Sequence, residues 1–573
     1  MSEQNTPPRK PDAGPVYHYG EQNANGTQEV YVTLTENSDT REKNIVFASQ
    51  WVIPVIFVPG VMGTNLKKKG DKTDDVWHPP NGTWDTAALA FGFFFKNAKK
   101  RQILFNKDEA EVDWGGPIEA DRVQLHNDKD HAKKVLYERG WGSVHWSSYG
   151  EILQDLHLKL NQEILVRSGP LSTPELQEWW AKTMQADPAD FGCVTGQAKP
   201  LTEKEIKELK RYRFEIWCCG YNWLQSNSES ARDLDAYIQK VLKVYEREDE
   251  PRARKVIVVT HSMGGLVTRG MLQLPGAQER VLGVVHGVQP ATGAPAVYKR
   301  ARCGFEGAEQ VVLGRNAAEA TAVMANAPAL LEMLPFADYN RGKPWLKVEG
   351  HAFALPKEGD PFGEIYGSTA WYGLVPEQST NLIDPAKMIV STLKDGKTVR
   401  DVFDDTLRFV LKFQKSITQP GSNYHPVTHA YCGIDRERKT WGEFTWRGQV
   451  PAEMDISNAQ LMRDDGDGRI MVGAGKQIAL KEDAPNQDSD SIVSAWSGVA
   501  PFAYSKSFFI HGQGQVPDEN SINLMRTSNA DAPAWKKSYE HQFSYGDDKK
   551  LYRGLWATLY GITRIAQLAD WAK

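Results

Sequence analysis

The stretch that decides the fold is Lys255-Val-Ile-Val-Val-Thr-His-Ser-Met-Gly-Gly-Leu-Val267. Its apolar, β-branched first half predicts a buried strand, and the residues after Gly264 continue as a helix. A serine at the turn between such a strand and helix forms the arrangement called a nucleophile elbow. The elbow forces Ser262 into a strained turn at the carboxyl edge of the sheet. We therefore predict Ser262 as a nucleophile.

Thr260 is a departure from this motif, because it stands where the elbow usually has its first glycine. Threonine carries a Cβ and a methyl group, so we expect looser packing at this point. Gly264 and Gly265, which follow the serine, partly restore the match to the nucleophile-elbow motif. The alternative interpretation is a serine in an ordinary strand-to-helix turn, in a chain that keeps a cleft without catalysis.

Strands and helices alternate along the chain. The predicted strands are residues 51–58, 214–219, 256–259, 281–285, 427–434 and 470–472, and the predicted helices include residues 149–165, 228–245 and 551–568. This alternation predicts an α/β fold, a doubly wound, mostly parallel sheet with large inserted cap or lid regions.

The 573 residues are explained by insertions into one fold rather than by several domains. Residues 1–28 are polar and proline-rich and predict a flexible N-terminal arm. Residues 29–573 are expected to form a single domain, with cap insertions at about 68–145, 166–210 and 300–425.

Composition excludes several classes of function. The 68 Lys and Arg against 73 Asp and Glu leave a net charge of −5, so no basic excess favours nucleic acid as a partner. The 5 Cys are sparse and form no Cys-x-x-Cys pair, which disfavours a zinc site or a disulfide scaffold. The N-terminus lacks the apolar core of a signal peptide, and no apolar stretch approaches the roughly 20 residues that span a bilayer. We expect a chain made in the cytoplasm without a signal peptide.

Acyl transfer to a serine needs backbone N–H groups that hold the oxyanion. Met263, directly after the nucleophile, is expected to supply one of them. The loop Pro59-Gly-Val-Met-Gly63 follows the first strand and is expected to supply the other, from Val61 or Met62. Gly60 lets the backbone approach the substrate closely. The alternative interpretation of this loop is a plain glycine turn.

Several motifs together resemble those of lecithin:cholesterol acyltransferase-like and PGAP1-like α/β-hydrolases. They are Phe57-Val-Pro-Gly-Val-Met-Gly-Thr-Asn-Leu66, Gly220-Tyr-Asn-Trp223, the His-Ser-Met-Gly-Gly elbow and Val285–Pro295. Asn222 and Leu224 depart from the family's Tyr-Asp-Trp-Arg segment. The resemblance covers about residues 50–300. It implies an α/β-hydrolase fold and a lipid-directed ester hydrolase, with an acyltransferase as the alternative.

The resemblance also suggests where the acid of a Ser-His-Asp triad lies. Asp464-Asp-Gly-Asp-Gly-Arg-Ile470 looks like the family's Gly-Asp-Gly-Thr-Val box, and Asp467 takes the matching position. Asp464 and Asp465 are the alternatives. A calcium loop is the competing interpretation, because these carboxylates are dense. The remaining ligands of such a loop are missing, so we expect neither a metal nor another cofactor.

The base is expected near the C-terminus, in the chain order Ser, Asp, His. Only His511 and His541 follow Asp467. His541 directly precedes the closing helix and is the favoured base, and His511 is the alternative. In the predicted mechanism His541 takes the proton from Ser262 while Asp467 orients the imidazole.

The segment Ala87–Phe95 is apolar and is followed by cations at Lys96 and Lys99. An apolar segment beside cations suits contact with an anionic lipid surface, so it predicts a lid that touches the acyl chain. The lid residues are Phe91, Phe93, Phe94 and Phe95. The alternative is a buried helix of a cap.

The large insertions, the missing signal peptide and the polar arm resemble the PGAP1-like group of antibacterial lipase effectors exported by type VI secretion. This resemblance implies phospholipase activity on a phospholipid or membrane surface. It also implies secretion, action in a target cell's periplasm or membrane, and a cognate immunity protein over the cleft. A non-catalytic, lipid-binding protein of the same fold is the remaining alternative.

Overall fold

The computed structural model describes residues 49–572 apart from several gaps. The gaps are 71–74, 80–95, 121–122, 124–128, 162–163, 166–174, 177–179, 181–183, 247–251, 308, 395, 420–423, 517–537 and 547–552. Of residues 1–48 it describes only the backbone of the strands β1 (Val16–Tyr19), β2 (Glu21–Gln22), β3 (Gln28–Glu29) and β4 (Lys43–Val46). The rest of the predicted arm and the predicted lid at Ala87–Phe95 lie outside the described residues.

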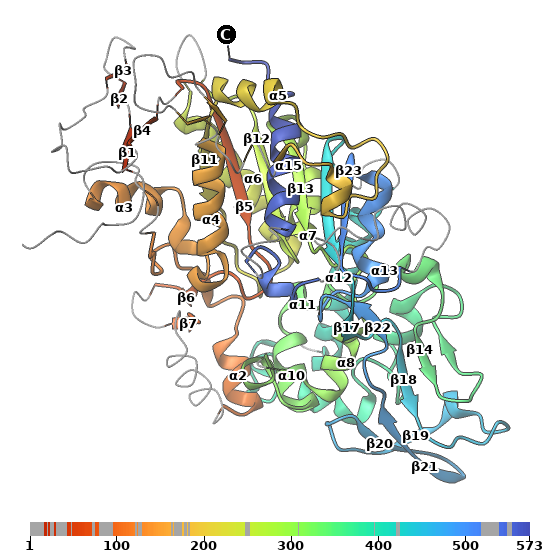
Figure 1. Ribbon diagram of the computed structural model, residues 1–573. Helices are drawn as coiled ribbons and strands as arrows, with labels where there is room; N and C mark the ends of the chain where they lie inside the picture. Colours follow the sequence, from red (N-terminus) through yellow and green to blue (C-terminus); the bar gives the residue numbers. More distant parts are fainter. Residues whose placement is uncertain are drawn as a thin grey trace, which may run out of the picture.

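Six parallel strands form the central sheet in the order β11-β5-β12-β13-β16-β23 (Figure 1). They are β5 (Val52–Val58), β11 (Arg213–Cys218), β12 (Val256–His261), β13 (Val281–Gly287), β16 (Thr428–Gly433) and β23 (Ser507–His511). The chain starts at β5, adds β11 on one side and then returns to add β12 on the other. The strand order therefore reverses between β5 and β12, where open α/β sheets bind their ligands. The predicted α/β fold is confirmed.

Helices cover both faces of this sheet (Figure 1). On one face lie α6 (Asn227–Val244) and α7 (Gly264–Leu272), and on the other α4 (Trp146–Asn161) and α15 (Arg553–Ala566). The β5 side chains alternate between the two apolar cores, with Val52, Ile56 and Val58 in the first and Ile53, Val55 and Phe57 in the second. Burial on both faces explains why β5 is a continuous apolar run in the sequence.

A second sheet of six strands lies apart from the first, in the order β15-β14-β18-β21-β20-β19 (Figure 1). Its strands are β14 (Leu346–Val348), β15 (Ala354–Leu355), β18 (Phe444–Arg447), β19 (Gln460–Asp464), β20 (Arg469–Ala474) and β21 (Lys476–Glu482). The expectation that residues 470–472 continue the central sheet is wrong, because β20 pairs with β19 and β21. Ile470 and Val472 are buried and Met471 is half-buried, a pattern typical of an antiparallel sheet with one covered face.

Four strands of the second sheet are inserted between two paired strands. β16 continues directly into β17 (Asp435–Thr440), which pairs antiparallel with β22 (Gln487–Ser489). The chain forms β18 to β21 between these two strands. It therefore returns to the edge of the central sheet at β22, immediately before Asp490.

Further described helices and strands lie outside the two large sheets. The helices are α2 (Ala98–Leu104), α3 (Lys129–Glu138), α5 (Glu203–Glu208), α8 (Pro295–Cys303), α9 (Glu309–Leu313), α10 (Ala317–Met324), α11 (Pro328–Leu331), α12 (Val399–Ser416) and α13 (Ala495–Gly498). The strands β6 (Leu66–Lys68), β7 (Asp75–Trp77) and β8 (Ala110–Val112) form a small antiparallel sheet. None of the described helices combines the length and the apolar character that a membrane crossing requires.

Candidate active site

Ser262 lies at the sharp turn from β12 into α7. Its φ is 53°, in the left-handed region, and its backbone N–H donates to the carbonyl of Gly287 at 2.9 Å. A Cβ on Gly264 would lie 2.4 Å from the Pro59 carbonyl oxygen and 2.6 Å from that of Val58. Only glycine fits there, because both neighbouring atoms belong to the backbone. The predicted nucleophile elbow is therefore present in its geometry.

Thr260, the departure from the elbow motif, is fully buried rather than loosely packed. Its Oγ1 lies 2.9 Å from Nδ1 of His286, the residue opposite it on β13. Burial lowers the pKa of His286 to about 3, so the ring is neutral. A hydrogen bond across neighbouring strands thus accommodates a side chain where the motif usually has none.

The structure brings His541 to Ser262. His541 begins the short helix η13 (His541–Phe543) just before α15, and its Nε2 lies 2.8 Å from Ser262 Oγ. The alternative, His511, ends β23 and is buried elsewhere. Its ring nitrogens lie 2.8 Å from the Tyr539 hydroxyl and 3.1 Å from the Phe191 carbonyl oxygen. Of the two candidate bases, only His541 therefore contacts the serine.

The carboxylate that holds His541 is Asp490. Its Oδ2 lies 2.7 Å from His541 Nδ1, and its Oδ1 accepts the backbone N–H groups of Ile492 and Val493. The backbone N–H of His541 also donates to the backbone carbonyl of Asp490 at 2.9 Å. Because a carboxylate only accepts, Nδ1 carries the ring proton and Nε2 is free to accept the Ser262 hydroxyl proton.

The prediction of Asp467 as this acid is wrong. Asp467 lies in the turn between β19 and β20, where it is exposed and paired with Arg469. Its neighbours are also engaged by arginines, Asp464 by Arg302 at 2.9 Å and Asp465 by Arg463 at 2.6 Å. The resemblance placed the acid in an Asp-rich box, but this box belongs to the inserted second sheet.

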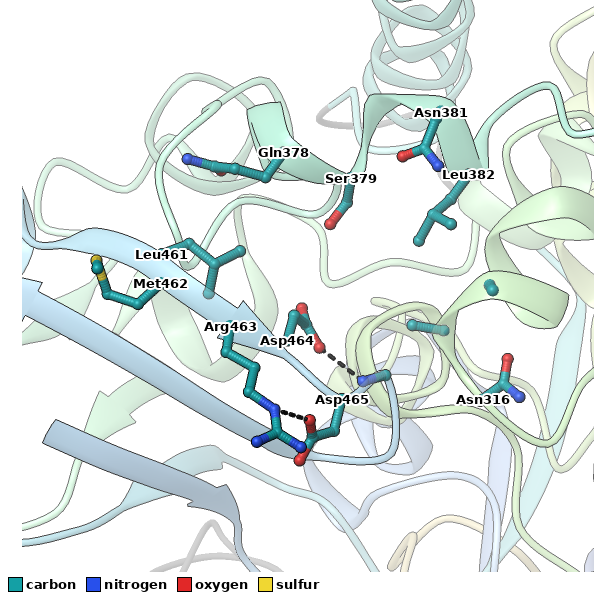
Figure 2. A pocket seen from close by; sticks show the side chains of 13 residues that line it. Asn316, Gln378, Ser379, Asn381, Leu382, Leu461, Met462, Arg463, Asp464 and Asp465 are labelled. Atoms are coloured by element: carbon teal, nitrogen blue, oxygen red, sulfur yellow. Dashed lines mark hydrogen bonds and ion pairs between the residues drawn. The ribbon is translucent and has the colours of Figure 1, made fainter. Parts of the chain in front are cut away.

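Figure 2 shows this turn at the wall of a separate pocket of about 420 Å³, with Arg463 bonded to Asp465 and Asp464 accepting the Gly466 N–H. Arginines occupy the carboxylates that a calcium ion would need. Among the described residues, no group of three or more His, Cys, Asp or Glu side chains is placed to hold a metal ion.

A weak signal in the sequence could have found Asp490. The acid often occurs as Asp-x-x-(Val/Ile) after a late strand, and Asp490-Ser-Ile-Val493 fits this pattern as well as Asp467-Gly-Arg-Ile470 does. The strand before it, β22, has only 3 residues, Gln487, Asp488 and Ser489, and all of them are polar. It therefore lacks the apolar pattern by which a strand is recognised in a sequence.

Ser262 and His541 line a cavity of about 260 Å³. Its wall is mostly apolar and includes side chains from α8, α9, α10 and α11: Val297, Leu313, Met324 and Leu330. Charged groups are few, among them Arg300, Glu309 and Glu540. The reactive serine therefore opens into an apolar slot that fits an aliphatic chain better than a polar group.

The predicted oxyanion donors lie around the same serine. Val61 and Met62 line the cavity, and Met263 begins the turn into α7 beneath it. Among the described residues, none accepts a hydrogen bond from the backbone N–H of Val61, Met62 or Met263. These N–H groups are available to an oxyanion, and the helix N-terminus adds the positive end of its dipole.

The sheet order and the strained serine at the end of β12 together define an α/β-hydrolase. Residues 225–311 match the family described as PGAP1-like alpha/beta domain. A chain of the solved structure "The crystal structure of Tle4-Tli4 complex" is 37% identical and superimposes with a TM-score of 0.74, covering 91% of this chain and 99% of that chain. No similar protein was found among curated protein sequences. The chain belongs to the Tle4 family, which confirms its resemblance to the PGAP1-like lipase effectors of type VI secretion.

Proposed function

We propose that this protein hydrolyses lipid carboxylic esters, as a lipase or phospholipase A, through Ser262, His541 and Asp490. The observation that carries the proposal is the pair of contacts at His541, 2.8 Å to the Ser262 hydroxyl and 2.7 Å to the Asp490 carboxylate. The apolar cavity that opens at this serine supports a substrate with an acyl chain. Membership of the Tle4 family supports the same class of substrate.

The proposed reaction has two steps. His541 Nε2 takes the Ser262 proton while Oγ attacks the ester carbonyl carbon, and the N–H groups of Met263 and of Val61 or Met62 stabilise the oxyanion. The imidazolium then protonates the leaving alcohol. In the second step His541 activates a water that releases the fatty acid. Asp490 stabilises the imidazolium throughout and keeps its proton on Nδ1. The proposed chemistry uses no metal and no cofactor.

We propose a phospholipid membrane as the substrate surface. The segment Ala87–Phe95 stays the proposed lid, with its four Phe side chains against the acyl chain. Delivery by type VI secretion into the periplasm or membrane of a target cell, with an antibacterial effect, is part of the same proposal. The Tle4-Tli4 complex supports a cognate immunity protein that binds this chain and covers its cleft.

The test is release of free fatty acid from phosphatidylglycerol and phosphatidylethanolamine vesicles. We expect Ser262→Ala to lower the rate by at least about 10³-fold, because the nucleophile of a triad has no substitute. Ser505→Ala is the control and should retain the rate. Ser505 directly follows the short helix η11 (Ala500–Tyr504) and does not line the cavity at Ser262. Equal release by wild type and Ser262→Ala would contradict the proposal. Transfer of the acyl group to an added alcohol instead of water would identify an acyltransferase.

A further inference from the structure

The loop that carries one of the two oxyanion donors, Val61 or Met62, is strained. In the turn from Gly60 to Gly63 the Gly63 N–H donates to the Gly60 carbonyl at 3.1 Å, and Met62 has a φ of 61°. A residue with a side chain costs about 1–2 kcal/mol in this left-handed conformation. Such a conformation persists only where surrounding contacts impose it.

One of these contacts comes from Trp77, at the end of β7. Its indole Nε1–H donates to the Met62 carbonyl at 2.7 Å, which fixes the peptide on the strained side of the turn. The indole is itself held, because Trp77 is buried and its ring packs edge-on against the fully buried Trp223 at 6.2 Å. Trp77 therefore acts on the loop as a rigid donor.

The other contact comes from Tyr149, on α4. The Gly60 N–H donates to the Tyr149 hydroxyl at 3.1 Å, and that hydroxyl lies 3.0 Å from His261 Nδ1. A Cβ on Gly63 would lie 2.7 Å from the Tyr149 ring, so the loop and the ring are in close contact. Tyr149 therefore holds the loop at Gly60 and Gly63, whereas Trp77 holds it at Met62.

The chain of hydrogen bonds continues to the base. His261 Nε2 lies 3.0 Å from the His541 carbonyl oxygen, and since a carbonyl only accepts, Nε2 carries the proton. Burial lowers the pKa of His261 to about 3, so its Nδ1 is a free acceptor. Burial also raises the pKa of Tyr149 to about 12, so its hydroxyl keeps the proton that it donates to His261. One buried path thus joins Gly60, Tyr149, His261 and His541.

We propose that Trp77 and Tyr149 are positioning residues that clamp the loop 59–63 in the conformation that receives the oxyanion, with Tyr149 also setting the base loop through His261. The inference rests on the proposed function, because it assigns a role within that reaction. Neither side chain is part of the Ser262, His541 and Asp490 set. Trp77 also lines the cavity at Ser262, and a Phe in its place keeps an aromatic ring there while it removes the hydrogen bond to the Met62 carbonyl.

The test uses Trp77→Phe and Tyr149→Phe, which keep the rings and remove the hydrogen bonds. Each variant is expected to lower kcat on a short-chain p-nitrophenyl ester by about tenfold or more, with KM changed less than about twofold. Affinity for an alkyl boronic acid, which forms a tetrahedral adduct with the serine, should fall by the same factor. A structural role alone would lower the melting temperature without this parallel loss.

Two matched controls separate these outcomes. Trp371→Phe removes an indole donor to a backbone carbonyl, Ile456 O at 2.7 Å, and Tyr212→Phe removes a hydroxyl that accepts a backbone N–H, that of Ala572 at 3.0 Å. Both should retain kcat. Unchanged kcat in both Trp77→Phe and Tyr149→Phe overturns the clamp. If Ser262→Ala is inactive in the same assay, that result leaves the proposed triad intact, whereas an active Ser262→Ala overturns the triad itself.

Discussion

Asp490 and Asp467 can be distinguished experimentally as the acid of the proposed triad. It is buried at His541 Nδ1, whereas Asp467 is exposed and paired with Arg469 on the second sheet. We expect Asp490→Asn to lower kcat by about 10³- to 10⁴-fold, because the amide favours the wrong imidazole tautomer. Ester hydrolysis under saturating substrate is the measurement. Asp467→Asn is the control and should stay within about twofold; the opposite pattern would restore Asp467 as the acid.

The site residues differ in how far the sequence reveals them. Ser262 could be predicted because a strand, an elbow and a helix are contiguous around it, and His541 because it directly precedes the closing helix. Asp490 could not be told apart from Asp467, because its only local signal is a three-residue strand and a four-residue pattern that Asp467 shares. Hydrogen bonds between distant segments, such as Trp77 to Met62, leave no pattern in the sequence at all.

Glu332 shows how one element is capped by another. It follows α11 and is fully buried, and it accepts the Ser226 hydroxyl at 2.6 Å and the Asn227 N–H at 2.7 Å, at the start of α6. Burial raises the pKa of Glu332 to about 7. A raised folded-state pKa means that this contribution to stability is fully present below the ordinary carboxyl pKa and is lost as the pH rises through about 7.

We therefore expect Glu332→Gln to remove the pH dependence that Glu332 gives to the free energy of unfolding. Between pH 5 and pH 8 the free energy of unfolding of the wild type should fall by roughly 2–3 kcal/mol relative to the variant. Urea unfolding at the two pH values measures this difference. Glu437→Gln, at an exposed position on β17, should show no such change. A wild-type curve that runs parallel to that of Glu332→Gln would mean that Glu332 titrates normally.

The start of α7 depends on a glycine. A Cβ on Gly264 would meet two backbone carbonyl oxygens at 2.4 and 2.6 Å, so the helix must move away from β5 to admit it. We expect Gly264→Ala to destabilise the fold by about 1–3 kcal/mol and to lower ester hydrolysis by displacing Ser262. Thermal unfolding and the ester assay measure the two effects. Gly196→Ala, with no atom within 4 Å of the added Cβ, should change neither.

Elements buried on both faces were predictable, and those of the insertions were not. The runs at β5 and β12 are apolar throughout because helices cover both sides, and such runs identify parallel strands directly. The strand at 470–472 was also recognisable as a strand. Its assignment to the central sheet was wrong. The periodicity of apolar residues shows that one face of a strand is covered, but it does not show to which sheet the strand belongs.

At the scale of the whole molecule, Arg302 joins the second sheet to the elements around the cavity. This buried side chain of α8 donates to the carbonyls of Trp371 and Gly373 at 2.8 and 2.9 Å and to Asp464 at the end of β19 at 2.9 Å. We expect Asp464→Asn to lower the free energy of unfolding by about 1–3 kcal/mol, because the hydrogen bond loses its charge. Chemical denaturation measures it.

Asp467→Asn serves as the comparison in the same turn, and its exposed ion pair with Arg469 should contribute little to the free energy of unfolding. Equal stability of the two variants would show that Asp464 does not connect the sheet to α8. Both variants should retain the esterase kcat, since neither side chain reaches Ser262 in the structure.

The serine and the imidazole that meet at 2.8 Å are 279 residues apart along the chain. Between them the chain completes the last three strands of the central sheet, β13, β16 and β23, and the whole of the second sheet. Closing a loop of that length before its contacts form is slow, and a chain of this size folds through intermediates. We therefore expect the proposed catalytic pair to assemble late, because a partly folded chain can already bury its first four parallel strands while the serine has no base. On the proposed mechanism, newly made protein would stay inert until folding is nearly complete, which would delay ester hydrolysis in the cell that makes it.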